Sequence, residues 1–202
     1  FALSLLVEAR GDEPLKDGSG PASYLNVAYA TFSNSEKLFS NSEKLDLFVP
    51  DGLPPYPLVV VFHGGGYIWG NKDSLDPSIK SSLLSAGYAV ASVDYRLSTE
   101  ALFPAALLDA KAAIRFLRAS SAQYGLDPDR IAGFGDSAGG NLAGMLGVTG
   151  DMLELDAPEL GNFGTSSRVQ AVVDWFGPTD FSRIIEEAHE DGCIDYGSPR
   201  WI

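Results

Sequence analysis

The residues around Ser137 carry the clearest chemical signal in the chain. Gly135-Asp136-Ser137-Ala138-Gly139 is a G-x-S-x-G pentapeptide between an apolar segment, IAGF, and a run of small residues, AGGNLAGMLGV. A sharp turn from strand to helix would expose the serine Oγ, and the flanking glycines let neighbouring backbone approach closely. The following helix would point free N–H groups at negative charge forming above the serine. The pattern predicts Ser137 as a nucleophile; a plain glycine-rich turn is the alternative.

A second glycine cluster, His63-Gly64-Gly65-Gly66-Tyr67, follows the apolar run LVVVF. Acyl transfer creates an oxyanion that needs backbone N–H donors, and loss of one donor costs about 3 kcal/mol. We expect the N–H groups of Gly65, Gly66 and Ala138 to be these donors. A phosphate-binding loop is the alternative, but the Lys-Ser/Thr pair that it requires does not follow these glycines. His63 is expected to brace the loop rather than to act as a general base.

A third segment, Asp94-Tyr95-Arg96-Leu97 with Glu100 after it, places charged residues at the end of another apolar run. We expect Arg96 to form an ion pair with Asp94 or with Glu100. This ion pair would hold the loop in place. We expect no catalytic role for these residues. Pro104 follows closely and is suited to the first turn of a helix.

The three segments together resemble a known family. HGGGYIWG at 63–70, DYRLSTEALFPAALLDA at 94–110 and GDSAGGNLA at 135–143 resemble carboxylesterases of the hormone-sensitive-lipase-like branch of the α/β-hydrolase fold. VVDWFGPTDF at 172–181 is more similar to bacterial carbohydrate-ester esterases, which include acetyl and feruloyl esterases. The resemblance implies the roles given above to Ser137 and to the three N–H donors. The chain departs from it at Ser-Thr 98–99, where relatives often carry Ala-Pro.

A serine hydrolase of this fold needs an acid and then a histidine after the serine in chain order. Asp180 and His189 satisfy that order, but only eight residues separate them, and His189 stands in a charged run, EEAHED, typical of a solvated face. We therefore expect the acid and the histidine to lie beyond Ile202. In that case residues 1–202 alone would be nearly inactive and marginally folded, because triad loss costs several orders of magnitude and a sheet edge would lie uncovered.

The elements that must position these residues follow from apolar patterning. Four runs without alternation are typical of strands covered on both faces of a parallel sheet, and they lie at Leu58–Phe62, Tyr88–Val93, Ile131–Phe134 and Val169–Phe176. Two shorter strands are predicted at Val27–Phe32 and Leu45–Val49, and helices at Ser78–Ser85, Ala105–Ala122 and Gly139–Val148. In the longest helix the cations Lys111, Arg115 and Arg118 lie opposite the apolar face. This order predicts an α/β protein of the α/β-hydrolase fold, mostly parallel with helices on both faces, its site beyond the carboxyl ends of the strands.

Length and composition set the domain organisation. The 202 residues, 45% of them hydrophobic, fit one domain, predicted at 22–202 and incomplete at its C-terminus. Residues 1–21 form an N-terminal segment whose FALSLLVEA is compatible with the end of a signal peptide or with an ordinary terminus, and a secreted or periplasmic location is favoured over the cytoplasm. The heptad FSNSEKL occurs twice, at 32–38 and 39–45, and carries no chemistry.

Charge and cysteine content exclude several classes of partner. Asp and Glu number 27 against 14 Lys and Arg, a net charge of −13 that disfavours nucleic acid and anionic lipid. The apolar runs are shorter than the ~20 residues of a membrane-spanning helix. Cys193 is the one cysteine, and His and Cys are not clustered at metal-ligand spacing, so we expect no cofactor or metal. The oligomeric state does not follow from the sequence.

The sequence therefore favours a serine esterase acting on a small-molecule ester, either short-chain or carbohydrate-linked, through an acyl-enzyme on Ser137. One alternative is a serine peptidase of the same fold. Another is a non-catalytic ligand-binding protein, since some relatives, such as the plant gibberellin receptors, keep the serine and the glycine loop but lose the base. Tyr67, Trp69 and Trp175 are candidates to line the pocket, and core packing is an equal interpretation for each.

Overall fold

The computed structural model describes residues 22–30, 43–150, 152–184 and 186. They contain a six-stranded sheet with the order β1-β2-β4-β3-β5-β6, namely β1 (Ala22–Ala28), β2 (Lys44–Val49), β3 (Tyr56–Phe62), β4 (Ala89–Val93), β5 (Leu126–Asp136) and β6 (Ala171–Trp175). Strands β3 to β6 pair in parallel, and β2 joins β1 and β4 antiparallel. The N-terminal segment 1–21, most of the duplicated heptads, His189, Cys193 and Ile202 lie outside the described residues.

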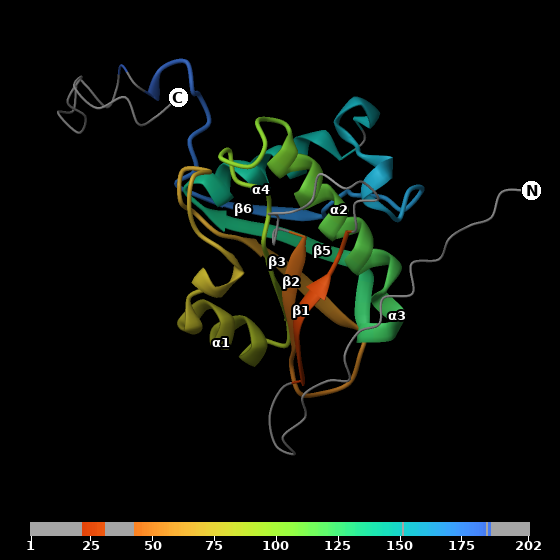
Figure 1. Cartoon of the computed structure of the whole chain (residues 1–202). Coiled ribbons are helices and arrows are strands. Elements are labelled where there is room, and N and C mark those ends of the chain that lie inside the picture. Colours follow the sequence, from red (N-terminus) through yellow and green to blue (C-terminus); the bar gives the residue numbers. More distant parts are fainter. Residues whose placement is uncertain (1–21, 31–42, 151, 185, 187–202) are drawn as a thin grey trace, which may run out of the picture.

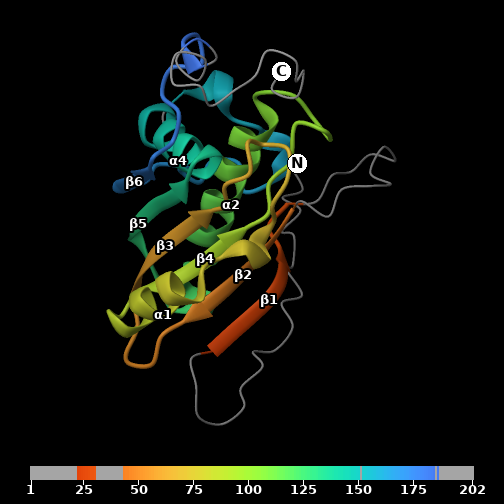
Figure 2. The ribbon, with the colours of Figure 1, turned by 90° about the vertical axis from the view of Figure 1, so that its left-hand side faces the viewer.

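Helices cover both faces of this sheet (Figures 1 and 2). α1 (Pro77–Ser85) lies on one face, whereas α2 (Ala105–Ala119), α3 (Ser121–Tyr124) and α4 (Ala138–Thr149) lie on the other. Short 3-10 turns stand at η1 (Lys72–Ser74), η2 (Leu153–Leu155) and η3 (Pro158–Leu160). Along β3, Leu58, Val60 and Phe62 join the large core that includes α2 and α4, while Val59 and Val61 join the smaller cluster with α1 residues. The strand is buried on both sides, as its unbroken apolar run predicted.

Three strands differ from their prediction, and one of them, β5, begins at Leu126, five residues before the predicted start at Ile131. β1 begins at Ala22, five residues before the predicted start at Val27, and it shifts register between Tyr24 and Val27, where Asn26 adopts a φ of 57°. This bulge interrupts the alternation from which a strand is recognised. β6 was expected to be covered on both faces, yet Val173 and Trp175 are each 51% exposed. α4 packs on one face of β6, and among the described elements none covers the other.

Two of the three cations of α2, Lys111 and Arg115, are buried beneath the end of α4 and the segment that follows it. Lys111 Nζ donates to Thr149 O at 2.7 Å, and an Arg115 Nη donates to Ala157 O at 2.9 Å. Both side chains are fully buried. Arg118 Nε, one turn further along, donates to Pro128 O at 2.9 Å. Charge-assisted hydrogen bonds to carbonyl oxygens thus join α2 to the end of α4, to the irregular segment after it and to β5.

The loop after β4 is fixed to α2 by a buried ion pair. Arg96 binds the fully buried carboxylate of Asp109 through Nε and Nη2, at 2.8 and 2.7 Å. Asp94 instead accepts a hydrogen bond from the Lys72 N–H, and Glu100 accepts one from the Leu97 N–H. The predicted partner of Arg96 is therefore wrong, although the predicted function of the pair, holding this loop, is the one observed.

Candidate active site

Ser137 forms the turn that joins β5 to α4. Its φ of 53° and ψ of −120° lie in a region that costs a residue with a side chain about 1–3 kcal/mol. The Ser137 N–H donates to Trp175 O of β6 at 2.9 Å, and the Asn141 N–H donates to Ser137 O at 3.0 Å. The neighbouring strand and the first turn of α4 thus hold the strained backbone, with Ser137 partly exposed at the carboxyl edge of the sheet.

The glycines flanking this turn allow the backbone to approach closely. A Cβ on Gly135 would lie 2.3 Å from the carbonyl carbon of Gly139. A Cβ on Gly139 would lie 2.0 Å from Phe62 O, at the end of β3. Neither contact is possible for a real side chain, so the G-x-S-x-G pattern is required for the steric reason that the sequence indicates.

The glycine loop after β3 lies directly beside the nucleophile turn. A Cβ on Gly64 would be 2.5 Å from a carboxylate oxygen of Asp136, the residue before Ser137. Gly65 and Gly66 have φ values of 121° and 59°, and a Cβ on Gly65 would be 2.0 Å from Trp69 O. Among the residues that the structure describes, no hydrogen bond uses the N–H groups of Gly65, Gly66 or Ala138. The loop therefore offers unpaired donors at the edge where Ser137 lies.

The ring of His63 supports the glycine loop. It is 6% exposed, stacks on Tyr95 with ring centroids 4.3 Å apart, and its Nδ1–H donates to Gly64 O at 2.7 Å. The Tyr95 hydroxyl donates to His63 O at 2.7 Å. Burial lowers the pKa of His63, which favours the neutral ring. These contacts make His63 a brace of the loop, and its Nδ1 is already occupied.

The three aromatic candidates take different positions. Tyr67 packs against the core, and its hydroxyl donates to Asn141 Oδ1 at 2.6 Å. Trp69 is 69% exposed at the end of the glycine loop. Trp175 is half exposed at the end of β6, with its ring 6.0 Å from that of Phe134. Trp69 and Trp175 are thus exposed, whereas Tyr67 packs against the core.

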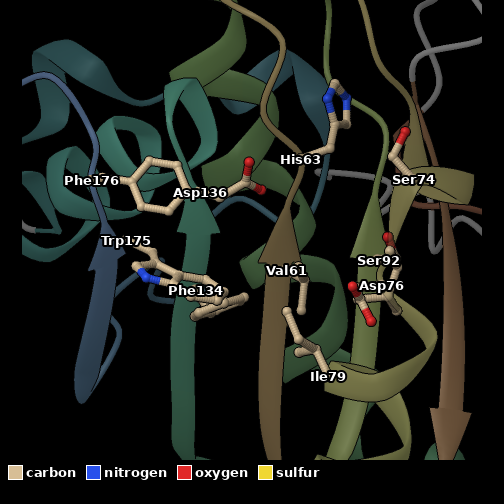
Figure 3. A pocket seen from close by; sticks show the side chains of 11 residues that line it. Val61, His63, Ser74, Asp76, Ile79, Ser92, Phe134, Asp136, Trp175 and Phe176 are labelled. Atoms are coloured by element: carbon tan, nitrogen blue, oxygen red, sulfur yellow. The ribbon is translucent and has the colours of Figure 1, made fainter.

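A cavity of about 290 Å³ lies on the α1 side of the sheet, near the carboxyl ends of β3, β5 and β6 (Figure 3). Asp136 is the last residue of β5 and His63 follows β3, and the rings of Phe134 and Trp175 lie between β5 and β6. Ser137 does not line it. The lining residues are Val61, His63, Ser74, Leu75, Asp76, Ile79, Ser92, Phe134, Asp136, Trp175 and Phe176.

Of the two in-chain candidates for the rest of a triad, the structure describes Asp180, which makes no hydrogen bond to Ser137. Asp180 is exposed, and its carboxylate accepts hydrogen bonds from the Ser182 N–H and hydroxyl at 2.9 and 2.5 Å, which lower its pKa. His189 lies outside the described part of the chain. The described residues contain no group of three or more His, Cys, Asp or Glu side chains able to hold a metal. Within the same residues no helix has the length and apolar character needed to cross a bilayer.

Asn141 is the residue that sequence reasoning missed. It belongs to the GDSAGGNLA segment, but no role followed from its position there. In the structure it contacts three segments of the site: the Ser137 turn, Tyr67 and the Pro178 carbonyl. The only signal for it was a polar side chain in a helix otherwise made of small and apolar residues.

Comparison with known proteins places this geometry in a family. The BD-FAE family model matches residues 45–197, more than half of the 202 residues, including both glycine motifs. The chain belongs to the BD-FAE family. The mostly parallel sheet with helices on both faces has the predicted α/β-hydrolase fold, and similar solved structures agree with it.

The BD-FAE chain is similar to esterases in sequence and in structure. It is 44% identical over 90 residues to Carboxylesterase NlhH of Mycobacterium tuberculosis, a match that covers 45% of this chain and 28% of that protein. The solved structure "Truncated form of carbohydrate esterase from gut microbiota" superposes with a TM-score of 0.74 at 34% identity, over 90% of this chain and 64% of the other. A bifunctional GH43-CE protein of Bacteroides eggerthii gives 0.73 at 36% identity, over 85% and 24%. The chain thus spans only 28% of the length of the curated relative.

Proposed function

We propose that this chain carries the nucleophile and the oxyanion donors of a serine esterase that hydrolyses carboxylic esters through an acyl-enzyme on Ser137. The strained turn at Ser137, facing a glycine loop with unpaired N–H groups, is the observation that carries the proposal. The similarity to proteins named carboxylesterase and carbohydrate esterase supports it. The substrates we propose are short-chain or carbohydrate-linked esters.

The proposed reaction begins when Ser137 Oγ attacks the ester carbonyl carbon and a general base takes the hydroxyl proton. The carbonyl oxygen becomes an oxyanion, which accepts hydrogen bonds from the N–H groups of Gly65, Gly66 and Ala138. The intermediate collapses to acyl-Ser137 and releases the alcohol, which takes up the proton. Water then attacks the acyl carbon, regenerating Ser137 and releasing the carboxylic acid.

We propose that the general base and its acid come from outside the described residues. His63 is buried against Tyr95, and Asp180 is exposed with its carboxylate bonded to Ser182; neither side chain hydrogen-bonds to Ser137 in the described part of the chain. Trp69 and Trp175 supply exposed aromatic surface near the carboxyl edge of the sheet, and we propose that they contact the acyl or the alcohol group.

The proposal is tested by hydrolysis of p-nitrophenyl acetate and butyrate and of an acetylated sugar by the natural protein and its Ser137→Ala variant. We expect Ser137→Ala to lower turnover at least ~10³-fold on every ester, since removal of a triad serine has effects of this size or larger. Ser81→Ala, which removes an exposed serine hydroxyl from α1, is the matched control and should be unchanged. Equal rates for Ser137→Ala and the natural protein would overturn the enzyme assignment and favour the non-catalytic ligand-binding alternative.

A further inference from the structure

The hydroxyl of Tyr67 directly connects the glycine loop to the nucleophile helix. It donates to Asn141 Oδ1 at 2.6 Å, across 74 positions of the sequence. Burial, followed by the charge of Asp174, raises the pKa of Tyr67, so the hydroxyl keeps its proton and remains a donor throughout the neutral range. This bond joins the loop that holds the proposed donors to the element that begins beside Ser137.

Asn141 is fixed on the helix side of this bond. Its backbone N–H donates to Ser137 O at 3.0 Å, the first intrahelical bond after the nucleophile turn. Its Nδ2 donates to Pro178 O at 2.8 Å, in the loop that follows β6. With its Oδ1 bound to Tyr67, the side chain has little freedom to rotate. A group attached to Asn141 is therefore placed relative to Ser137 itself.

Tyr67 is equally well fixed on the loop side. It follows Gly66 directly and adopts a φ of 61°, a left-handed conformation that is uncommon for a bulky residue. Its carbonyl oxygen accepts hydrogen bonds from the Ser98 N–H at 2.7 Å and from the Ser98 hydroxyl at 2.9 Å. Gly66 and Tyr67 share a planar peptide bond. Fixing the backbone of Tyr67 therefore also restricts the backbone of Gly66.

We propose that Tyr67 is a positioning residue that acts through Asn141 to hold the N–H groups of the glycine loop at the correct distance from Ser137. The inference rests on the proposed esterase function. An oxyanion donor is effective only at 2.7–3.1 Å from the oxygen, and a displacement of about 1 Å can cost ~100-fold in rate. The donors and the nucleophile lie on different segments of the chain, so a bond between these segments controls their separation.

The test compares Tyr67→Phe, Asn141→Ala and the double variant in the natural protein with p-nitrophenyl acetate. We expect Tyr67→Phe to lower kcat by roughly 10- to 100-fold while KM changes less than about threefold, since the interaction lost acts mainly on the transition state. The double variant should be no slower than Asn141→Ala alone, because both changes break the same connection. Tyr124→Phe is the matched control: it removes a buried hydroxyl that has no hydrogen-bond partner among the described residues, and its kcat should not change.

The outcomes separate this inference from the proposed function. If Ser137→Ala loses activity but Tyr67→Phe keeps the kcat of the natural protein, the positioning role is wrong and the esterase assignment stands. If Ser137→Ala keeps activity, the esterase assignment itself is wrong. A loss of activity in Tyr67→Phe that matches its loss of folded protein, measured by circular dichroism, would show a purely structural role and overturn the inference. Should Asn141→Ala fail to fold, the comparison of Tyr67→Phe with Tyr124→Phe decides alone.

Discussion

Replacing Ser137 with glycine should stabilise the protein while it removes the proposed nucleophile. The φ of 53° and ψ of −120° at this position are accessible to glycine without strain, whereas any Cβ is crowded there. Ser137→Ala loses the same hydroxyl but keeps the Cβ. The difference in stability between the two variants therefore isolates the backbone strain at the nucleophile turn from the effect of the hydroxyl.

The expected size of this difference follows from two opposing terms. A residue with a side chain in this region costs about 1–3 kcal/mol in the folded state. Glycine has more conformational entropy in the unfolded chain than alanine. This offsets about 0.5–1 kcal/mol of the stability gained when the backbone strain is removed. We therefore expect Ser137→Gly to be more stable than Ser137→Ala by about 1 kcal/mol. In a protein of this size that corresponds to roughly 2–4 °C in the midpoint of thermal unfolding.

Urea and thermal unfolding of both variants measure the difference, and a second pair of variants gives the reference. In the interior of an exposed helix, alanine is more stabilising than glycine by about 1 kcal/mol, so Ser81→Gly in α1 should be less stable than Ser81→Ala. The sign at Ser137 should be the opposite. If glycine is less stable than alanine at Ser137 as well, the backbone there is not strained and the argument for the nucleophile turn fails.

Three further predictions address the loop, its histidine and the buried ion pair. Gly65→Ala would place a Cβ 2.0 Å from Trp69 O, so we expect kcat to fall about 100-fold or more in the ester assay, and an unchanged kcat would count against Gly65 as a donor. Burial lowers the pKa of His63 below 6.5, so the unfolded chain takes up a proton before the native state does. The free energy of unfolding should therefore fall as the pH drops below about 6.5. This fall, measured by unfolding at each pH, should be smaller in His63→Asn; equal pH dependence would contradict the buried neutral ring. Asp109→Asn leaves Arg96 without its buried carboxylate and should destabilise the protein by ~3–5 kcal/mol in urea unfolding, whereas a loss below ~1 kcal/mol would show that the pair is dispensable.

Local patterns were sufficient to predict most of the fold and the glycine-flanked turn at Ser137. The unbroken apolar run of β3 is buried on both faces because helices cover both, and the sequence can show this without any long-range information. The turn at Ser137 is also marked by a local motif: Gly135 is required by the nearby Gly139, whereas Gly139 is required by Phe62 of β3, a distant part of the sequence.

Contacts that depend on the relative placement of distant elements could not be predicted. Arg96 pairs with Asp109 because the loop after β4 passes over α2, a geometry that charge spacing does not encode. Lys111 looks like a surface cation until the end of α4 packs against α2 and supplies the Thr149 carbonyl. Asn141 likewise gains its role only when Tyr67, 74 positions away, reaches it.

Covalent labelling of Ser137 is the most direct test of the central claim. The natural protein would be incubated with a fluorophosphonate, which reacts with an activated serine to give a stable phosphonyl adduct, and the adduct would be mapped by tandem mass spectrometry. We predict one adduct per chain, on Ser137, with loss of ester hydrolysis in proportion to labelling and no adduct in Ser137→Ala. An adduct on another serine, or full ester hydrolysis by a protein that Ser137 labelling has saturated, would contradict the account.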